Sequence, residues 1–168
     1  IVYQLIDTPK GKLVLAKDLA EAVLVRYGFA ESPVLAETTG AKLENLLFAH
    51  PFLKRDIPVL NGEHVTTDAG TGLVHTAPAH GLEDYFVCLK YGITLHNPVD
   101  AQGHYFPSVE RVGGLSVWEA NPVIIDWLAE NQVLLSNAKI EHSYAHCWRH
   151  KTPLIYRATP QSVSYTHL

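Results

Sequence analysis

Cysteine is scarce in this chain, and long apolar runs are missing from it. The 168 residues include only two cysteines, Cys88 and Cys147, too few for the disulfide framework of a small secreted protein. No apolar run approaches the roughly 18–20 residues that span a bilayer, and no signal-peptide pattern opens the chain. These absences predict a soluble, cytoplasmic protein that has no membrane partner.

Charge is also sparse. Charged residues make up 18% of the chain and apolar residues 47%, a balance typical of one globular domain. The net charge of −4 argues against a protein that coats nucleic acid, although it leaves room for a local basic patch. The chain also lacks a Gly-x-Ser-x-Gly elbow, an HExxH helix and a P-loop, so the commonest signatures of hydrolases and nucleotide-binding enzymes are missing.

The order of apolar runs and turn residues predicts an α+β domain around a mixed, curved sheet with about three helices. Strands are expected at residues 1–6, 12–15, 33–38, 46–49, 57–60 and 73–76. The first helix is expected to begin at Asp18, with Glu21 completing a capping box, and to end at Gly28. The others are expected over residues 82–91 and from the Asn121-Pro122 pair onward.

Residues 66–85 carry an unusual density of residues with special chemistry. Three glycines, two histidines and an acid pair lie there, among them Gly70, Gly72, His75, His80 and Asp84. The glycines allow the backbone to pass close to a ligand, and the other three can ionise. Because such a density is costly for folding, we interpret this segment as a functional site.

Asp84 and His75 each allow two interpretations. On a helical wheel Asp84 lies about 200° away from an apolar stripe, so it is not expected to pack the helix down; the stripe is Leu82, Tyr85, Phe86 and Leu89. It is either a first-turn acid that favours the helix dipole or an anion aimed at a cationic ligand group. His75 is either a core histidine bonded to a carbonyl group or a site residue.

A second cluster near the end of the chain has the density of soft ligands seen in zinc sites: His142, His146, Cys147 and His150. Cys147-x-x-His150 supplies only half of a structural zinc site, so we assign no metal ligand in this chain. Arg149 and Arg157 lie in the same region among aromatic residues. That mixture suits phosphate and base contacts, and equally a packed junction with a neighbouring domain.

Two long motifs resemble one enzyme family. The run Thr67-Asp-Ala-Gly-Thr-Gly-Leu-Val-His-Thr-Ala-Pro-Ala-His-Gly-Leu-Glu-Asp-Tyr85 resembles the editing-domain signature of isoleucyl-tRNA synthetases. The runs His142-Ser-Tyr-Ala-His-Cys-Trp-Arg-His-Lys-Thr-Pro153 and Arg157-Ala-Thr-Pro-Gln161 resemble the strand that returns to the catalytic core. The resemblance covers residues 1 to about 161, and the sequences of the motifs are most similar to those of the bacterial form.

The resemblance implies a barrel-like editing (connective peptide) domain at residues 1–138 and a return strand toward the class I catalytic core at 139–161. It implies a parent enzyme that ligates isoleucine to tRNA with ATP and magnesium, and that hydrolyses misacylated valyl-tRNA. Zinc is a further candidate for that parent, and no cofactor is expected in this segment. The implied partners are the misacylated 3′ end of isoleucine tRNA and the rest of the synthetase chain.

The resemblance also implies roles for individual residues. In the family, the residue at the position of Asp84 binds the α-ammonium group of the misattached amino acid. The residue at the position of His75 lines the pocket that excludes isoleucine. Both are therefore candidate catalytic-site residues, expected to converge on a cavity sized for valine. Thr67, Thr71 and Gly72 are the further candidate substrate-binding residues.

This sequence departs from the family's pattern in two places. The threonine-rich peptide that forms the opposite wall of the editing pocket is missing before residue 1, and the ATP-site signatures are absent. The segment alone is therefore expected to be inactive. The family's Trp-Phe after Gln161 is replaced, so residues 162–168 are expected to be foreign to the domain.

Two alternatives remain beside the resemblance. One is a metal-dependent hydrolase that uses His75, His80 and the histidines of the 142–150 cluster. The other is a non-catalytic tRNA-binding module that uses the edge from Arg149 to Arg157.

Overall fold

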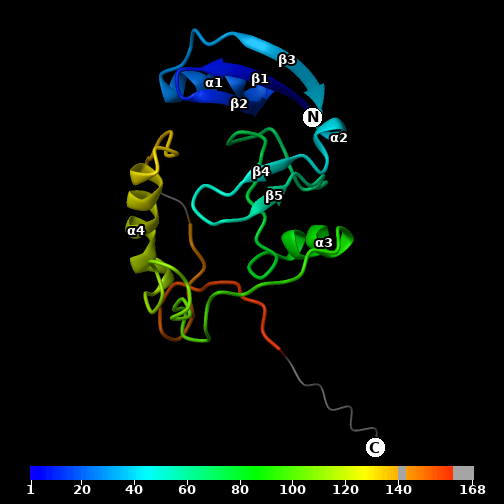
Figure 1. Cartoon of the computed structure of the whole chain (residues 1–168). Coiled ribbons are helices and arrows are strands. Elements are labelled where there is room, and N and C mark those ends of the chain that lie inside the picture. The colour runs from blue at the N-terminus through cyan, green and yellow to red at the C-terminus, as the bar shows by residue number, and fades with distance from the viewer. Residues whose placement is uncertain (140–142, 161–168) are drawn as a thin grey trace, which may run out of the picture. The chain divides into compact units, whose positions relative to one another are not determined.

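The computed structural model describes residues 1–139 and 143–160 (Figure 1). The chain forms two compact units. The first consists of Ile1–His75 and Trp118–Glu141, and the second of Thr76–Val117 and His142–Leu168. The long signature segment of residues 66–85 is therefore divided between the two units.

A three-stranded antiparallel sheet organises the first unit. β1 (Val2–Thr8) lies in the centre, between β2 (Gly11–Ala16) and β3 (Val34–Thr39). The β1–β2 register runs from the Tyr3–Ala16 pair to the Thr8–Gly11 pair, which makes a tight hairpin. These strands confirm the predicted hairpin and the strand predicted at 33–38.

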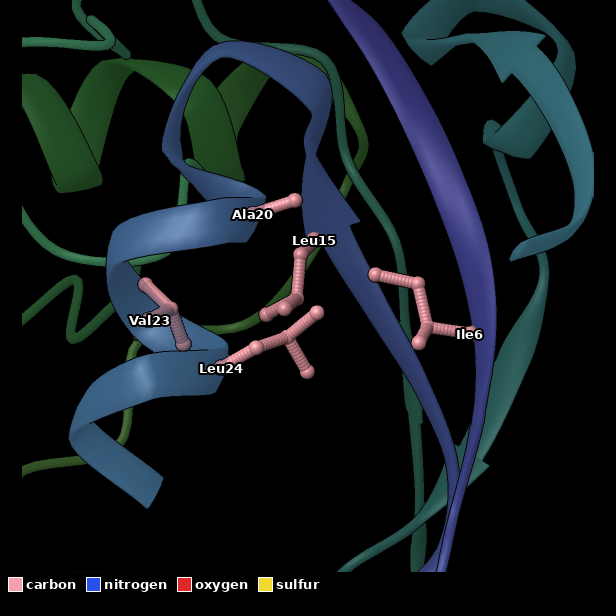
Figure 2. Packing of buried hydrophobic residues seen from close by; sticks show 5 residues of the cluster. All are labelled: Ile6, Leu15, Ala20, Val23 and Leu24. Atoms are coloured by element: carbon pink, nitrogen blue, oxygen red, sulfur yellow. The ribbon is translucent and has the colours of Figure 1, made fainter. Parts of the chain in front are cut away.

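Helix α1 (Lys17–Tyr27) covers this sheet and closes its core. Figure 2 shows the side chains of α1 directed toward those of β1 and β2; the buried cluster is Ile6, Leu15, Ala20, Val23 and Leu24. Ile6 and Val23 are almost completely buried, and each contributes about 1.5–3 kcal/mol of hydrophobic stabilisation. Apolar burial on one helix face therefore holds α1 in place.

The ends of α1 confirm one predicted signal and correct the other. Gly28 ends the helix in the left-handed conformation (φ 76°), and its N–H donates to carbonyl groups of the last turn, as the sequence predicts. The prediction of Asp18 as the first cap is wrong, because Ala16 occupies that position without a side-chain cap. Asp18 instead lies within the first turn, where its charge still favours the helix dipole.

The rest of the first unit consists of short elements and one long helix. α2 (Gly40–Leu43) is a single turn, and β4 (Leu47–Ala49) pairs with β5 (Asp56–Pro58) in an antiparallel ribbon. α4 runs over Val117–Glu130 and contains Pro122. The predicted start at Asn121-Pro122 is therefore wrong. The pattern Ser116-Val-Trp-Glu119, typical of a capping box, marks the earlier start.

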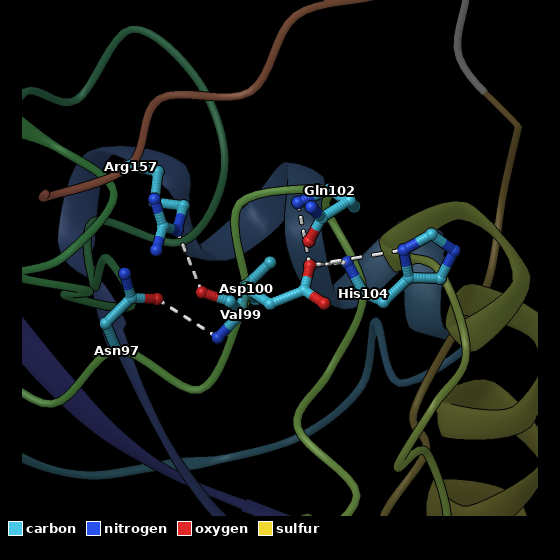
Figure 3. Close-up of polar contacts among 6 residues, drawn as sticks. All are labelled: Asn97, Val99, Asp100, Gln102, His104 and Arg157. Atoms are coloured by element: carbon cyan, nitrogen blue, oxygen red, sulfur yellow. Dashed lines mark hydrogen bonds and ion pairs between the residues drawn. The ribbon is translucent and has the colours of Figure 1, made fainter.

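The second unit contains α3 (Leu82–Lys90) and long loops. Isolated antiparallel bridges join Val99 to Tyr105, His104 to Ser116 and His146 to Pro153. Figure 3 shows how the loop after α3 is held: Asn97 Oδ1 accepts from the Val99 N–H, and Asp100 Oδ1 accepts from the N–H groups of Gln102 and His104. These hydrogen bonds hold the pKa of the Asp100 carboxyl below its usual value, and the bond from the His104 N–H has the largest effect.

The α+β class is confirmed, with differences in detail. Every strand pairing among the described residues is antiparallel, and no closed barrel forms among them. Residues 1–139 and 143–160 contain four helices, the three expected ones and the single turn α2. Residues 140–142 and the tail 162–168 fall outside the described residues. Within the described parts, no helix combines the length and apolar character needed to cross a membrane.

Candidate functional site

The first half of the signature segment is attached to the edge of the three-stranded sheet. The carbonyl oxygen of Thr71 accepts a 2.9 Å hydrogen bond from the Ala16 N–H. The Tyr3 hydroxyl group donates to the carbonyl oxygen of Gly72 at 2.7 Å, in a buried position. Burial of Tyr3 raises the pKa of its phenol. These two contacts fix the loop at the candidate substrate-binding residues Thr71 and Gly72.

Gly72 cannot be replaced without strain. Its φ of +76° lies in the left-handed region, and an added Cβ would lie 2.3 Å from Cβ of Ala16. The loop therefore passes directly against the end of β2, an approach that only glycine permits. The neighbouring Thr71 hydroxyl group donates to the carbonyl oxygen of Leu73 at 3.2 Å, and it is partly exposed. Thr67, the other candidate threonine, is also partly exposed.

The strand predicted at residues 73–76 is wrong. Leu73 and Val74 are 39% and 55% exposed, and no described strand pairs with this segment. Apolar composition alone predicted it, but a strand also requires a hydrogen-bonded neighbour. His75 is exposed as well, so the interpretation as a core histidine is wrong too. Its imidazole is available at the surface of the first unit.

His50 lies in the electrostatic neighbourhood of His75, a relationship that no sequence pattern indicated. Burial lowers the pKa of His50, and electrostatic interactions with Arg55 and His75 lower it further. The N–H groups of Phe52 and Leu53 donate to His50 Nδ1 at 3.3 and 3.1 Å, which requires that nitrogen to be unprotonated. The surroundings of His50 thus favour a neutral imidazole.

Asp84 is held from two sides in the second unit. It is the third residue of α3, and its Oδ2 accepts a 3.0 Å hydrogen bond from the Ala77 N–H. The carboxylate lies so close to Gly81 that an added Cβ at residue 81 would be 2.7 Å from Oδ2. Gly81 is the cap residue of α3, where glycine is common, so its position before the helix was the one available sequence signal. Ala77 and Gly81 therefore position the carboxylate.

The helical-wheel prediction for α3 is wrong about which face packs. Leu82, Phe86 and Leu89 are 66%, 57% and 60% exposed, whereas Cys88 is buried. Asp84 lies one turn before Cys88, on the packed side, and is partly buried. Burial raises the pKa of the Cys88 thiol, and the negative charge of Asp84 raises it further. The apolar stripe failed as a guide because the polar contacts of Asp84 attach the start of the helix.

His80 serves the fold of the second unit. Its Nδ1 lies 2.8 Å from the carbonyl oxygen of Tyr156, and since a carbonyl group only accepts, Nδ1 must carry the hydrogen. The Ala158 N–H donates to the Ala79 carbonyl oxygen at 2.7 Å. Arg157 Nε donates to the carbonyl oxygen of Val99 at 2.8 Å (Figure 3). Arg157 thus attaches the last described part of the chain to the loop that follows α3.

The soft ligands do not assemble into a metal site in the described parts of the chain. Across residues 1–139 and 143–160, no group of three or more His, Cys, Asp or Glu side chains could hold a metal ion. His142, a member of the predicted cluster, lies outside those ranges. The metal-dependent alternative therefore has no described ligand set.

The structure distributes the predicted site residues over the two units. Thr67, Thr71, Gly72 and His75 belong to the first unit and Asp84 to the second. Within the first unit, Thr71, Gly72 and His75 follow one another along a single surface loop. The convergence of His75 and Asp84 on one cavity stays a prediction.

Comparison with known proteins identifies the family. No protein-family model matches the chain. Isoleucine–tRNA ligase of Neisseria meningitidis serogroup C is 75% identical over 162 residues, which are 96% of this chain and 17% of that protein. The enzyme of the same name from Chromobacterium violaceum is 56% identical over 159 residues, or 95% of this chain and 17% of that protein.

The chain belongs to the isoleucine–tRNA ligase family. The resemblance to isoleucyl-tRNA synthetases is therefore confirmed at the level of the family. The chain spans about 17% of the length of the curated relatives it matches, so it corresponds to a segment of an isoleucine–tRNA ligase.

Proposed function

We propose that this segment belongs to the editing domain of an isoleucine–tRNA ligase and, in the complete enzyme, hydrolyses valine misattached to isoleucine tRNA. In this proposal residues 1–138 are editing domain and residues 139–161 return to the catalytic core. The complete enzyme ligates isoleucine to its tRNA in the cytoplasm, using ATP and magnesium. The observation that carries the proposal is the carboxylate of Asp84, fixed by the Ala77 N–H at 3.0 Å.

An editing reaction meets a physical need of such an enzyme. Valine is isoleucine without one methylene group, and a binding pocket gains only about 1–3 kcal/mol from that group. One synthetic site therefore discriminates too weakly between the two amino acids. A second, smaller site that admits valine and excludes isoleucine raises the overall accuracy.

Asp84 has the chemistry of an anchor for the substrate's α-ammonium group. Charge-assisted hydrogen bonds between a carboxylate and an ammonium group are roughly twice as strong as neutral ones. The Ala77 N–H and the close approach to Gly81 hold the carboxylate before the substrate arrives. A pre-positioned anion needs no reorganisation on binding, which favours accurate placement of the ester bond.

His75 and the residues before it suit the side-chain pocket. The imidazole of His75 is exposed, and in this proposal its ring forms the wall that admits valine and excludes isoleucine. Thr67, Thr71 and Gly72 contact the substrate or the terminal adenosine of the tRNA. The contacts of Tyr3 and Ala16 keep Thr71 and Gly72 in place for that task.

The test compares Asp84→Ala with Glu83→Ala in a complete isoleucine–tRNA ligase that carries this segment. Glu83 is the adjacent, exposed acid in the same helical turn, so its removal changes the charge equally. We expect Asp84→Ala to slow the deacylation of valyl-tRNA at least about tenfold and to preserve isoleucylation, and Glu83→Ala to leave both rates unchanged. Deacylation at the parental rate in Asp84→Ala would refute the anchor role.

A further inference from the structure

The segment 145–154 forms a small hairpin in the second unit. The Leu154 N–H donates to the carbonyl oxygen of Ala145 at 3.0 Å, and the Cys147 N–H donates to that of Thr152 at 2.8 Å. The Lys151 N–H closes the turn by donating to the carbonyl oxygen of Cys147 at 2.8 Å. Residues 148–151 therefore form a tip of fixed backbone conformation.

The tip of the 145–154 hairpin exposes an aromatic ring next to two cations. Trp148 is 74% exposed, too much for a residue that packs the described fold. The guanidinium carbon of Arg149 lies 4.7 Å from the centroid of the Trp148 ring, a cation–π geometry. Lys151 is exposed beside them. Residues 143–160 contain no Asp or Glu, whereas the whole chain carries a net charge of −4.

The segment that follows this hairpin is attached by hydrogen bonds to the loop that holds Asp84. The carbonyl oxygen of Tyr156 accepts from His80 Nδ1, and the Ala158 N–H donates to Ala79. The same loop contains Ala77, whose N–H holds the Asp84 carboxylate. The side chain of Tyr156 is 78% exposed. Exposed aromatic and basic groups thus continue along the chain from the hairpin tip to the neighbourhood of Asp84.

We propose that the 145–154 hairpin and Tyr156 form a contact surface for tRNA, with phosphates held by Arg149 and Lys151 and an unpaired base stacked on Trp148. The inference deepens the proposed function and rests on it for the identity of the RNA. Exposed aromatic rings interleaved with basic groups, without acids, match the chemistry of single-stranded nucleic acid. Aromatic residues and arginine are enriched at protein interfaces as well, but lysine is depleted there, so Lys151 and the absence of acids favour nucleic acid over a protein partner.

The test measures binding of a fluorescently labelled, unacylated isoleucine tRNA transcript to a complete isoleucine–tRNA ligase carrying this segment, between about 50 and 200 mM salt. The variants are Trp148→Ala, Arg149→Ala and Lys151→Gly. Lys151 has a φ of +56°, so glycine removes the charge while relieving the backbone. Lys90→Ala is the matched control, since Lys90 is an exposed lysine of the same unit at the end of α3.

We expect Trp148→Ala to weaken binding about fivefold or more. Arg149→Ala and Lys151→Gly should each reduce the slope of log affinity against log salt by about 1, and Lys90→Ala should change neither quantity. Unchanged affinity and salt slope in all three variants would refute the proposed tRNA contact surface. So would a Trp148→Ala enzyme that melts at a lower temperature yet binds tRNA normally, because the hairpin would then be packed against protein.

These outcomes are separable from the proposed function. Asp84→Ala is expected to bind the unacylated transcript as the parent does, because that transcript has no α-ammonium group. If Asp84→Ala abolishes deacylation while the hairpin variants bind normally, the tRNA surface is wrong and editing stands. If the hairpin variants lose affinity while Asp84→Ala deacylates normally, the surface stands and the anchor role is wrong.

Discussion

The N–H group of Ala77 donates a 3.0 Å hydrogen bond to Oδ2 of Asp84, seven residues further along the chain. This bond joins the loop before α3 to the first turn of the helix. It turns a residue that could have been a simple first-turn acid into a carboxylate with a defined position. Gly81, between the two, leaves the space that the carboxylate occupies.

Gly81→Ala is predicted to displace Asp84. The new Cβ would lie 2.7 Å from Oδ2, while the backbone at residue 81 (φ −141°) accepts any residue. We expect valyl-tRNA deacylation in the complete ligase to fall about 10- to 100-fold, with isoleucylation retained. In the Gly81→Ala/Asp84→Ala double variant the two losses should not add, because the first acts through the second. Additive losses would show that Gly81 acts independently of Asp84.

His75→Ala is predicted to relax the selectivity of editing. If the imidazole excludes isoleucine by its bulk, removing it should allow isoleucyl-tRNA to be deacylated. One methylene group supports a roughly 10- to 200-fold discrimination between valine and isoleucine, and most of that discrimination should be lost. Release of labelled isoleucine from isoleucyl-tRNA measures this effect. His96→Ala, at another exposed histidine, is the control. Selectivity retained by His75→Ala would remove this residue from the pocket.

Two neighbouring glycines provide a matched test of the loop's attachment. Gly70 and Gly72 have nearly the same φ, +77° and +76°, but only Gly72 meets a neighbour, Ala16, when a Cβ is added. Gly70→Ala should cost about 1–2 kcal/mol in free energy of unfolding, and Gly72→Ala about 1–3 kcal/mol more. Urea denaturation of both variants measures the difference. Equal losses would mean that the loop does not pack against β2.

The stability of the protein should depend on pH through His50. The pKa of His50 is lowered by burial and by electrostatic interactions with Arg55 and His75, so protonation favours the unfolded chain, whose histidine titrates near 6.5. Its contribution is complete above that pH and is lost as the pH falls through the lower, folded-state pKa. His50→Asn keeps an acceptor for the Phe52 and Leu53 N–H groups and should flatten urea stability below pH 6.5. A profile identical to that of the parent would contradict this role.

The two cysteines should differ in reactivity. Cys88 is buried on the packed side of α3 and its thiol pKa is raised, whereas Cys147 is partly exposed in the hairpin. Because the thiolate is the reactive form, iodoacetamide should modify Cys147 at least about tenfold faster than Cys88 in the folded protein. Peptide mass spectrometry over time measures both rates. Comparable rates would mean that α3 does not pack through its Cys88 face.

Local sequence patterns were sufficient for most of the elements. The β1–β2 hairpin, the strands near residues 34, 47 and 57, and the end of α1 at Gly28 all follow from apolar alternation and turn residues. Helix starts were less accurate, because two nearby caps can compete. Asp18 and Asn121 were plausible first residues, yet α1 and α4 begin earlier.

The candidate site residues could be chosen from the sequence, since glycines, histidines and acids gathered in one segment indicate a functional segment whatever their arrangement. The arrangement was not accessible. Apolar stripes predict burial only when a neighbour covers them, and the stripe of Leu82, Phe86 and Leu89 is exposed while Cys88 and Asp84 face the fold.

The sequence by itself determined the family, the α+β class and which residues are candidates for the site, because these depend on residue identity and local spacing. Only the tertiary structure decided that Tyr3 and Ala16 hold the glycine loop, that Ala77 holds Asp84, and that Arg157 donates to the carbonyl oxygen of Val99. Each of these is a hydrogen bond between residues that local periodicity does not relate. Such bonds form only when the chain has folded, and no one-dimensional pattern encodes them directly.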